Sequence, residues 1–392
     1  MKKKHTDSII VTMIVFAVIG ILSLIPLSTG ILDPLARAIT DFDIYDLVFS
    51  KLRDEPPVDT SIVIVNVGNL DRAGIAAQLD SINNHNPKVI AIDIFFWKEK
   101  DPAQDAYLSD AISRCRNLTM VSMLSRYNED KESYDTLAFS LRKFTKNAET
   151  GFANFPEDEK GGFRTIRSFK PFAYCKNKKE EAFAVKIVEM ADKNKYNDFL
   201  ERNNESEIIN YRGNFNKFYF LDTYAIFDST TDLSLLKDKI VLIGYMGENL
   251  NTKVLEDIFF TPLNEKYAGR SYPDMYGVAV HANIVSMLMH NNYIDTMPRF
   301  LSLLLAVVFC FFCILGLFTI KSKYKDWFGA AFRWIILLVT ILELDLGVNI
   351  FNYFNYKINL TLLLAAIVLS PACMDLYQSF VEKRLFRTKN KR

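Results

Sequence analysis

Four long runs of apolar residues and one long polar block set the organisation of this 392-residue chain. The apolar runs lie at residues 9–27, 300–320, 332–350 and 358–377. A transmembrane helix needs ~20 largely apolar residues to cross about 30 Å of hydrocarbon, and the first two runs contain no charged residue. The third run contains Glu343 and Asp345, and the fourth contains Pro371. We expect about four transmembrane helices, with a folded domain at residues 28–299 between the first and the second.

The polar block opens with a strand–helix–strand pattern at residues 61–96. Residues 62–67 and 89–94 are short β-branched runs with few polar interruptions, which is typical of strands buried on both faces of a sheet. Apolar residues between the two runs recur at helical spacing, and Asn86 followed by Pro87 ends the helix. Two such strands joined by a helix predict a right-handed crossover with parallel strands.

Weaker patterns continue this alternation of strands and helices. Further strands are expected at residues 118–124, 207–211 and 239–243, and further helices at residues 106–114, 181–200 and 277–289. Residues 151–155 and 163–169 flank a turn-rich segment and predict a hairpin, whereas residues 125–148 predict a loop or a loosely helical insertion. An amphipathic helix at residues 34–53 leads into the block. The alternation predicts an α/β fold, namely an exterior three-layer α/β sandwich with a mostly parallel sheet.

Composition limits the chemistry of the chain. Half of the residues are hydrophobic and the net charge is +1, so composition gives no reason to expect a nucleic-acid partner. The four histidines lack zinc-ligand spacing, and no phosphate-binding or nucleophile-elbow motif occurs. We therefore expect no metal and no cofactor. Cys115 and Cys175 either form one disulfide or are two buried thiols.

Basic residues predict the orientation in the membrane. Lysine and arginine cluster before the first apolar run, between the second and the third, and after the fourth. The positive-inside rule therefore predicts that residues 1–8 and 378–392 are cytoplasmic and that residues 28–299 are periplasmic or extracellular. The first apolar run is longer than the core of a signal peptide and no clear cleavage site follows it, so we expect it to remain as an anchor. The chain is expected to be a multi-pass protein of the cell (inner) membrane.

Several short motifs of the polar block occur in an order found in a known family. They are IVIVNV at 62–67, Arg72, DIFF at 93–96, GFANFPEDEKGGFR at 151–164, INYRG at 209–213, LKDKIVLIG at 236–244, Asp257 and GVAVHANIVSML at 277–288. In this order they resemble the CHASE2 domain, the extracellular sensory module of bacterial transmembrane receptors. The resemblance covers about residues 45–297, and the three apolar runs that follow also resemble the usual arrangement of the family.

The chain departs from the CHASE2 pattern in three places. In the turn at residues 159–161, Glu-Lys-Gly replaces the aspartate that the family carries before the glycine. Residues 68–71 replace a longer stretch that the family usually carries after its first strand. CHASE2 receptors normally continue into an output domain such as a cyclase or a kinase, whereas only the basic residues 378–392 follow the last apolar run here. We therefore expect a separate cytoplasmic output protein. The resemblance also implies a homodimer.

The strand ends supply the candidate ligand contacts. In open α/β sheets ligands bind outside the carboxyl ends of the strands, and Asp93 ends the second predicted strand. The other candidates come from the family-like motifs and are Arg72, Asp158, Arg164, Arg212, Asp257 and His281. The arginines either clamp an anionic ligand or pair with the aspartates inside the fold. His281 either contacts a ligand or forms a hydrogen bond within the fold.

These observations predict a membrane-anchored, non-enzymatic sensor or adaptor. Its exterior domain would bind an unknown small molecule or an envelope protein, and its helices would signal to a separate cytoplasmic protein. One alternative is a component of a membrane transport or assembly complex that uses Glu343 and Asp345, two residues that point to opposite faces of a helix. A second alternative is an envelope enzyme built on Asp93, Asp158 and His281, although no nucleophile–base motif is present.

Overall fold

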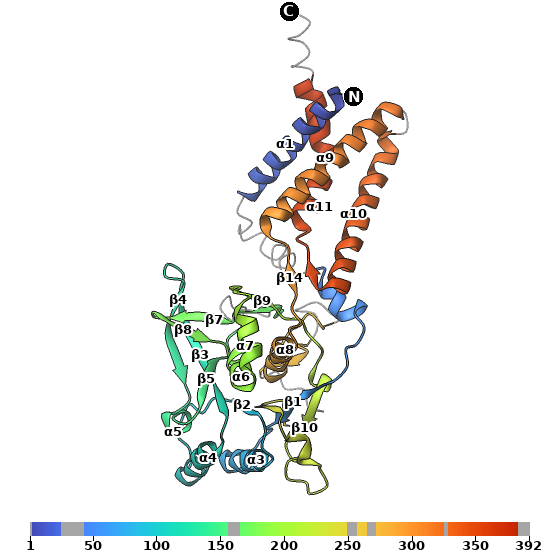
Figure 1. The fold of residues 1–392 in the computed structure, drawn as a ribbon. Coiled ribbons are helices and arrows are strands. Elements are labelled where there is room, and N and C mark those ends of the chain that lie inside the picture. Colours follow the sequence, from blue (N-terminus) through green and yellow to red (C-terminus); the bar gives the residue numbers. More distant parts are fainter. Residues whose placement is uncertain are drawn as a thin grey trace, which may run out of the picture. The chain divides into compact units, whose positions relative to one another are not determined.

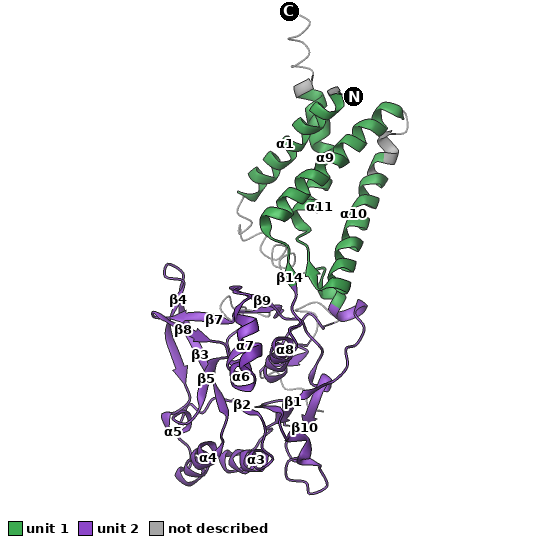
Figure 2. Cartoon of the chain, viewed as in Figure 1, with its two compact units in different colours: residues 1–48, 295–392 green, residues 49–294 purple. Residues whose placement is uncertain are grey.

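The chain divides into two compact units. The computed structural model describes residues 2–24, 43–155, 165–248, 257–264, 272–324 and 328–382. Residues 49–294 form one unit, here called the sheet unit, and residues 1–48 with 295–392 form the other, here called the helical unit (Figures 1 and 2).

A nine-stranded sheet forms the centre of the sheet unit. Its strand order is β10-β1-β11-β2-β3-β4-β7-β8, with β5 paired to β3. The strands are β1 (Asp59–Asn66), β2 (Val89–Asp93), β3 (Leu118–Asn128), β4 (Ser133–Phe139), β5 (Glu149–Phe152), β7 (Phe172–Cys175), β8 (Lys178–Glu181), β10 (Phe218–Leu221) and β11 (Ile240–Gly244). All neighbours from β10 to β3 are parallel, whereas β3 with β4 and β7 with β8 are antiparallel. The predicted strands β1 and β2 are therefore parallel, with β11 inserted between them.

Helices cover both faces of this sheet (Figure 1). Helices α3 (Arg72–Asn84) and α4 (Pro102–Arg114) contact each other and bury Leu79 and Leu108 against one face of the strands. Helix α8 (Gly277–Met289) contacts β1 and β11, and α6 (Phe183–Ala191) contacts α8, β2 and β3. Side chains alternate between the two faces along each strand. The arrangement confirms a three-layer α/β sandwich with a mostly parallel sheet.

Local capping explains where the first helices begin. The carboxylate of Asp71 accepts a hydrogen bond from the Gly74 amide at 2.8 Å, at the start of α3. Asp101 does the same for the Gln104 amide at 3.0 Å, with Pro102 at the first helical position. Aspartate at the N-cap and proline directly after it are strong start signals. For this reason α4 begins four residues earlier than the apolar spacing alone predicts.

The structure corrects the expectation for residues 125–148. This segment is not a loop, because β3 continues to Asn128, β4 follows, and a short helix α5 (Arg142–Thr145) comes next. Most side chains of β4 are partly or fully exposed, and Tyr134 is the buried exception. A half-exposed hairpin of this kind carries a weak apolar pattern, which explains why the sequence does not reveal it.

The predicted hairpin around residues 151–169 is also wrong. Strand β5 pairs in parallel with β3, and β6 (Ser168–Phe169) pairs with β9 (Glu207–Ile208), so the described parts of the two flanks do not pair with each other. The turn between them, at residues 156–164, lies outside the described residues. Gly151 explains the position of β5, because a Cβ atom there would lie 2.6 Å from the Phe183 Cα at the start of α6.

Other predicted elements are shorter than the pattern suggested. The helix expected at residues 181–200 divides into α6 and α7 (Lys193–Leu200), because the Asp192 carboxylate accepts hydrogen bonds from the amides of Asn194 and Lys195. The strand expected at residues 207–211 is limited to β9. The remaining short elements are η1 (Val48–Leu52), η3 (Phe215–Lys217), η4 (Leu233–Leu236), β12 (Ile258–Phe259) and β13 (Met275–Tyr276). Most of the helix expected at residues 34–53 lies outside the described residues.

The two cysteines of the sheet unit are buried free thiols. Cys115 and Cys175 form no disulfide. Burial raises the pKa of Cys115 to about 12, so its thiol stays protonated at neutral pH. Of the two alternatives that the sequence allows, the buried thiols are the correct one.

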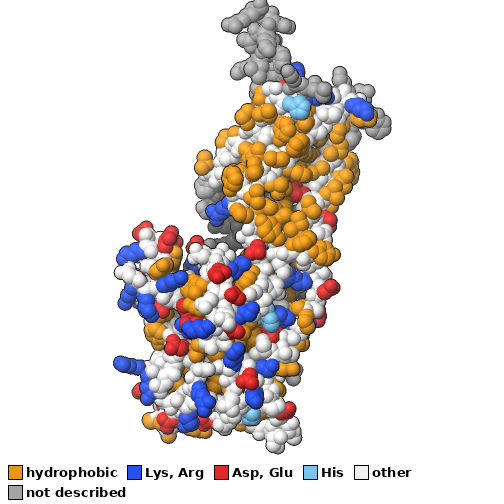
Figure 3. All heavy atoms as spheres, viewed as in Figure 1, with side chains coloured by type: hydrophobic (Ala, Val, Ile, Leu, Met, Phe, Trp, Pro, Cys, Tyr) orange, Lys and Arg blue, Asp and Glu red, His pale blue; other side chains and the backbone are white. Residues whose placement is uncertain are grey.

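Four long apolar helices form the helical unit. They are α1 (Lys2–Ser23), α9 (Arg299–Lys323), α10 (Phe328–Phe354) and α11 (Thr361–Leu376), the last continued by η5 (Tyr377–Glu382). Each contains a stretch long and apolar enough to cross a membrane, and exposed hydrophobic side chains cover much of the visible surface of the unit (Figure 3). Exposed apolar surface of this extent is typical of a protein embedded in lipid. The expectation of four membrane-spanning helices therefore agrees with their length and composition.

A small β-bridge joins three segments at one end of the helical unit. Strand β14 (Asp295–Thr296), just before α9, pairs in parallel with β15 (Tyr356–Lys357), between α10 and α11. The hydroxyl of Tyr45 donates to the Ile358 carbonyl at 2.6 Å, and Lys357 forms an ion pair with Asp43. Asp43 and Tyr45, which follow α1, are thus held against the segment that precedes α11. The same segment pairs with the strand that precedes α9.

Replacing Gly244 by Ala tests the close approach of α8 to the sheet. A Cβ atom at Gly244 would lie 2.6 Å from the Val278 Cβ, so the helix must shift, and we expect the free energy of unfolding to fall by about 1–3 kcal/mol. Urea-induced unfolding of the full chain in detergent measures this change. Gly74→Ala is the matched control, because its nearest neighbour is the flexible end of Leu70 and alanine favours a helix. Equal unfolding midpoints for the two variants would contradict the prediction.

Candidate ligand site at the carboxyl edge of the sheet

Four neighbouring parallel strands end at the same edge of the sheet, and three of them end in or directly before a polar residue. Asn66 of β1 is in register with Gly244 of β11, and Gly244 is in register with Asp93 of β2. On the other side of β1, Val65 pairs with Leu221 of β10, which places Asp222 beside Asn66. The insertion of β11 therefore brings side chains from distant parts of the chain into one row, where ligands of α/β sheets commonly bind.

Asn66 holds the loops on either side of this row. It is fully buried, and its side-chain oxygen accepts hydrogen bonds from the amides of Gly68 at 3.0 Å and Met246 at 2.9 Å. Its amide nitrogen donates to Asp222 Oδ1 at 2.9 Å and to the Gly247 carbonyl at 3.1 Å. A buried amide with all of its hydrogen bonds satisfied fixes its neighbours strongly. The loops after β1 and β11 are therefore held by one side chain.

A pocket of about 260 Å³ opens at this edge. The loop after β1, the start of α3 and the residues that follow β2 and β11 form its wall. The lining residues are Val67, Gly68, Leu70, Arg72, Ile75, Asp93, Ile94, Phe95, Phe96, Lys100 and Tyr245. This size suits a small organic molecule rather than a peptide.

Asp93 is the acidic group of the pocket. Burial raises its pKa well above the ordinary value, and the nearby carboxylate of Asp257 raises it further. In the part of the chain that the structure describes, no group donates a hydrogen bond to the Asp93 side chain. A partly buried carboxyl with this environment favours a bound proton or a bound cationic group.

Asp257 lies at the start of α8. Its backbone carbonyl accepts a hydrogen bond from the Gly277 amide at 3.0 Å, and a Cβ atom at Gly277 would lie 3.0 Å from the Asp257 carboxylate. A Cβ atom at that position would crowd the carboxylate beside the first turn of the helix. The structure therefore brings two of the predicted acidic residues, Asp93 and Asp257, into electrostatic contact.

Arg72 forms one wall of the pocket and is already paired. Its guanidinium is buried, forms an ion pair with Asp105 and donates to the Lys98 carbonyl. It also lies over the rings of Phe96 and Phe144, at 5.7 and 5.2 Å from their centroids. Of the two roles that the sequence left open for this arginine, the structure favours pairing within the fold, with Asp105 rather than Asp93.

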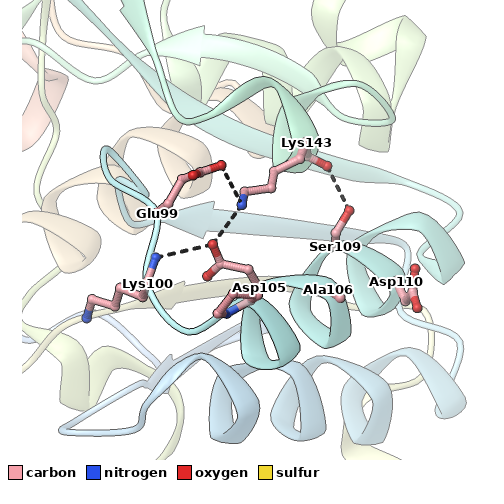
Figure 4. A pocket seen from close by; sticks show the side chains of 8 residues that line it. Glu99, Lys100, Asp105, Ala106, Ser109, Asp110 and Lys143 are labelled. Carbon is pink, nitrogen blue, oxygen red and sulfur yellow. Dashed lines mark hydrogen bonds and ion pairs between the residues drawn. The ribbon is translucent and has the colours of Figure 1, made fainter.

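Lys143 completes the charge balance around Asp105. Its Nζ lies 2.7 Å from Asp105 and 3.1 Å from Glu99, and the Lys100 amide donates to Asp105 at 3.3 Å (Figure 4). Burial opposes ionisation of Asp105, but these donors and Arg72 outweigh it and lower its pKa to about 2. A second pocket, of about 330 Å³, lies over this network. Its central charges are mutually satisfied, so it is a weaker ligand site than the first.

Arg212 takes part in a different network. It donates to Ser286 Oγ at 3.1 Å and to the Pro57 carbonyl at 2.8 Å, while Ser286 donates to Asp59 at 2.6 Å. These contacts connect the last turns of α8 with the start of β1. The starts of these parallel strands lie at the edge of the sheet opposite to the edge that carries Asp93. Arg212 is therefore placed in a structural network and not in the pocket.

His281 is packed among aromatic rings on α8. Its ring stacks on Phe155 at 4.9 Å and meets the edge of Phe183 at 5.3 Å. Burial lowers its pKa to about 3, so the ring is neutral at physiological pH. Its Nδ1 has no hydrogen-bond partner among the described residues. The two remaining candidates, Asp158 and Arg164, lie outside the described residues.

Sequence reasoning missed several residues of the site. Asn66 and Asp222 end strands just as Asp93 does, and Lys100 and Tyr245 line the pocket. The available signal was the polar residue that ends each apolar run, IVIVN for β1 and FYFLD for β10. No cluster of three or more metal-ligating side chains is present in the described part of the chain.

Comparison with protein-family models gives a match. The family model of the CHASE2 domain matches residues 13–318, which is more than half of the chain and includes the whole sheet unit. No curated protein and no solved structure matches the chain.

Replacing Asp105 by Asn tests the buried charge network. The variant leaves the buried Arg72 without its counter-charge, and we expect a clear loss of stability in urea-induced unfolding. The control is Asp80→Asn, which breaks the exposed ion pair with Arg114 and should cost only about 0–1 kcal/mol. The double variant Arg72→Met with Asp105→Leu should recover much of the loss, since it removes both charges. If Asp105→Asn is no less stable than Asp80→Asn, the network is not structural.

Proposed function

The chain belongs to the CHASE2 family of sensory domains, and we propose that its sheet unit binds a small molecule at the pocket beside Asp93. The family is sensory rather than catalytic, and the four apolar helices make the chain a membrane protein. The proposal places the sheet unit outside the cytoplasm and both termini inside, in agreement with the distribution of basic residues. Occupancy of the pocket is then reported through the helical unit to a separate cytoplasmic protein.

The environment of Asp93 supports the ligand site. Among the candidates of the sheet unit, Arg72 and Arg212 already have partners inside the fold, and His281 is packed among aromatic rings. Asp93 differs from them because it reaches the pocket without a donor from the described residues. The observation that carries the proposal is this unsatisfied carboxyl group in a pocket at the carboxyl edge of a parallel sheet.

The charge of the pocket favours a ligand with an amine or another cationic group. Burial and the carboxylate of Asp257 both disfavour the ionised form of Asp93. A cation bound between the two carboxylates would offset the repulsion between Asp93 and Asp257, and it would supply the missing hydrogen-bond donor to Asp93. The apolar side chains of Leu70, Ile75 and Phe95 line the same pocket and would contact the rest of the molecule.

The location of the pocket supports signalling along the chain. Asp257 adjoins the first turn of α8, and residues 290–298 join the end of α8 to α9. A ligand that draws Asp257 toward Asp93 would change the contacts at the start of α8. Such a ligand shifts the protein toward one arrangement only if it binds that arrangement more tightly.

Polar contacts between helices would carry the change toward the cytoplasm. Tyr377 donates to Asp7 at 2.7 Å, which links η5 with α1. Lys4 donates to Ser322 at 2.7 Å, which links α1 with α9, and Lys321 donates to Gln378 at 2.5 Å. These contacts connect three helices at the ends that we assign to the cytoplasmic side, where an output protein would bind.

Asp93→Asn tests the ligand site. A panel of small primary amines, from ethanolamine to putrescine and lysine, is screened by thermal unfolding of the full chain in detergent. An amine that binds wild type should raise its unfolding temperature by several degrees at about 100 times its Kd. Affinity should fall about tenfold or more in Asp93→Asn, because a charge-assisted hydrogen bond contributes ~1.5–3 kcal/mol.

The pH dependence gives a second readout for the same site. The raised pKa of Asp93 means that its carboxylate takes up a proton at higher pH than usual, so amine binding by wild type should weaken as pH falls through that value. The exposed Asp130→Asn is the matched control and should behave as wild type. No stabilising amine, or an Asp93→Asn variant that keeps wild-type affinity, would reject the site.

Co-purification tests the output. The full chain, gently solubilised from its native membrane, should carry a cytoplasmic protein that is identified by mass spectrometry. Deletion of residues 381–392 should reduce its recovery severalfold if the basic tail takes part in binding, while Asp93→Asn should leave recovery intact without ligand. If no cytoplasmic protein accompanies the full chain, signalling to a separate partner is wrong.

A further inference from the structure

A buried carboxyl group without a partner lies in the middle of α10. Glu343 is 6 % exposed, and neither of its carboxylate oxygens has accessible surface or a hydrogen-bond partner among the described residues. It lies within the apolar stretch Trp334–Phe354, beyond the part of the chain that the CHASE2 model matches. Neither the pocket beside Asp93 nor the family match accounts for a buried carboxyl group at this position.

The neighbours on α10 show which way Glu343 faces. Residues four apart lie on the same face of a helix, so Glu343, Gly347 and Phe351 share one face. A Cβ atom at Gly347 would lie 2.5 Å from Leu360 just before α11, and Phe351 packs on Tyr45 at 4.7 Å between ring centroids. Cys313 of α9 interacts electrostatically with Glu343. The carboxyl group is therefore directed into the helical unit, toward α9 and α11.

Asp345 provides the contrast on the same helix. It is exposed, and its carbonyl accepts a hydrogen bond from Asn349 at 2.8 Å. It lies two positions after Glu343 in sequence, so it points away from the other helices. As the sequence predicted, the two acidic residues point in different directions and do not form one site.

No cation among the described residues balances Glu343. The elements with the most extensive contacts to α10 are α9, α11 and β15, and Tyr45 also packs on Phe351. The titratable groups of α9 are Cys310 and Cys313 in its middle and Arg299, Lys321 and Lys323 at its ends. Helix α11 contains Cys373 and Asp375. Strand β15 contains Tyr356 and Lys357. Lys321 lies within 3.9 Å of Asp375, and Lys357 pairs with Asp43. At 1.5 Å per residue, Arg299 and Lys321 lie roughly 21 and 12 Å along α9 from Cys313.

Electrostatics then determines the state of this carboxyl group. An ionised carboxylate moved from water into an apolar interior without a partner costs several kcal/mol even after relaxation. A neutral carboxylic acid avoids that cost, and it gains a hydrogen-bond donor. The hydroxyl of Thr340, one turn earlier on α10, is buried, lacks a partner among the described residues and can accept this bond.

We propose that Glu343 is a proton-binding site inside the helical unit, and that the neutral carboxylic acid permits α10 to pack against α9 and α11. Release of the proton places an unpaired negative charge in that interface and drives α10 away from it. The ligand of this site is a proton, and its occupancy controls the packing of one membrane helix. The inference requires only that α10 crosses the membrane and does not depend on the ligand pocket of the sheet unit.

Infrared spectroscopy of the full chain in lipid bilayers tests the protonation. The difference spectrum of wild type minus Glu343→Gln should contain, at pH 7, the carbonyl band of a protonated carboxylic acid that shifts in D₂O. At alkaline pH that band should give way to carboxylate bands. Glu343→Gln mimics the neutral acid and should fold as wild type does, and Asp345→Asn should retain the band. Carboxylate bands alone at pH 7 would overturn the proposal.

The native Cys313 reports on the packing of α10. Alkylation of this thiol by a membrane-permeant maleimide, read from its own peptide by mass spectrometry, is compared between wild type and Glu343→Gln from pH 6 to pH 9. The ratio of the wild-type rate to the Glu343→Gln rate removes the pH dependence that the thiol shows in both proteins. Because an ionised Glu343 would disfavour the nearby thiolate and slow alkylation, an increase in this ratio reports exposure of the thiol. The ratio should be close to one at low pH and rise severalfold as Glu343 loses its proton. A ratio that stays constant over this range would overturn the link between the proton and the packing.

Discussion

The hydrogen bonds of one buried amide, that of Asn66, determine the shape of the candidate site. Its oxygen holds the loops after β1 and β11, and its nitrogen holds Asp222 and Gly247. Asp222, Met246 and Gly247 are far from Asn66 in sequence. They meet it because β10 and β11 lie on either side of β1 in the sheet. The pocket beside Asp93 is formed by the same loops, so its dimensions depend on the strand order of the sheet. A fixed framework of this kind lets a small ligand bind without first ordering the chain, which favours affinity.

The sequence reveals those parts of the fold that are buried on both faces. The strands β1, β2 and β11 are continuous apolar runs, and the polar residues Asn66 and Asp93 that end β1 and β2 lie at the candidate site. The half-exposed strands β4, β7 and β8 leave only a weak pattern. The contact between Asn66 and Asp222 spans 156 positions and depends on which strand lies beside which, and a pattern of apolar residues carries no such information. The same holds for Arg72, whose partner Asp105 lies on another helix.

The chain buries carboxylates in two different ways. Asp105 is surrounded by donors from Arg72, Lys143 and the backbone of Lys100, so it is ionised and fixes the structure around it. Glu343 has no donor among the described residues, so burial acts on it without compensation. A satisfied charge resists change, whereas an unsatisfied carboxyl group responds to the proton concentration. Asp105 is therefore suited to a fixed scaffold. Glu343 is suited to a helix whose packing changes with pH.

The bridge between β14 and β15 also constrains the order of folding. Tyr45 and Asp43, which follow the first helix, bind Ile358 and Lys357, at sequence separations of 313 and 314 residues. The pairing of β14 with β15 likewise needs the segment between α10 and α11. None of these contacts can form until residues 357 and 358 have been synthesised, and long-range contacts of this kind slow folding. The sheet unit, whose contacts lie between residues 49 and 294, can fold first, and the end of the helical unit closes last.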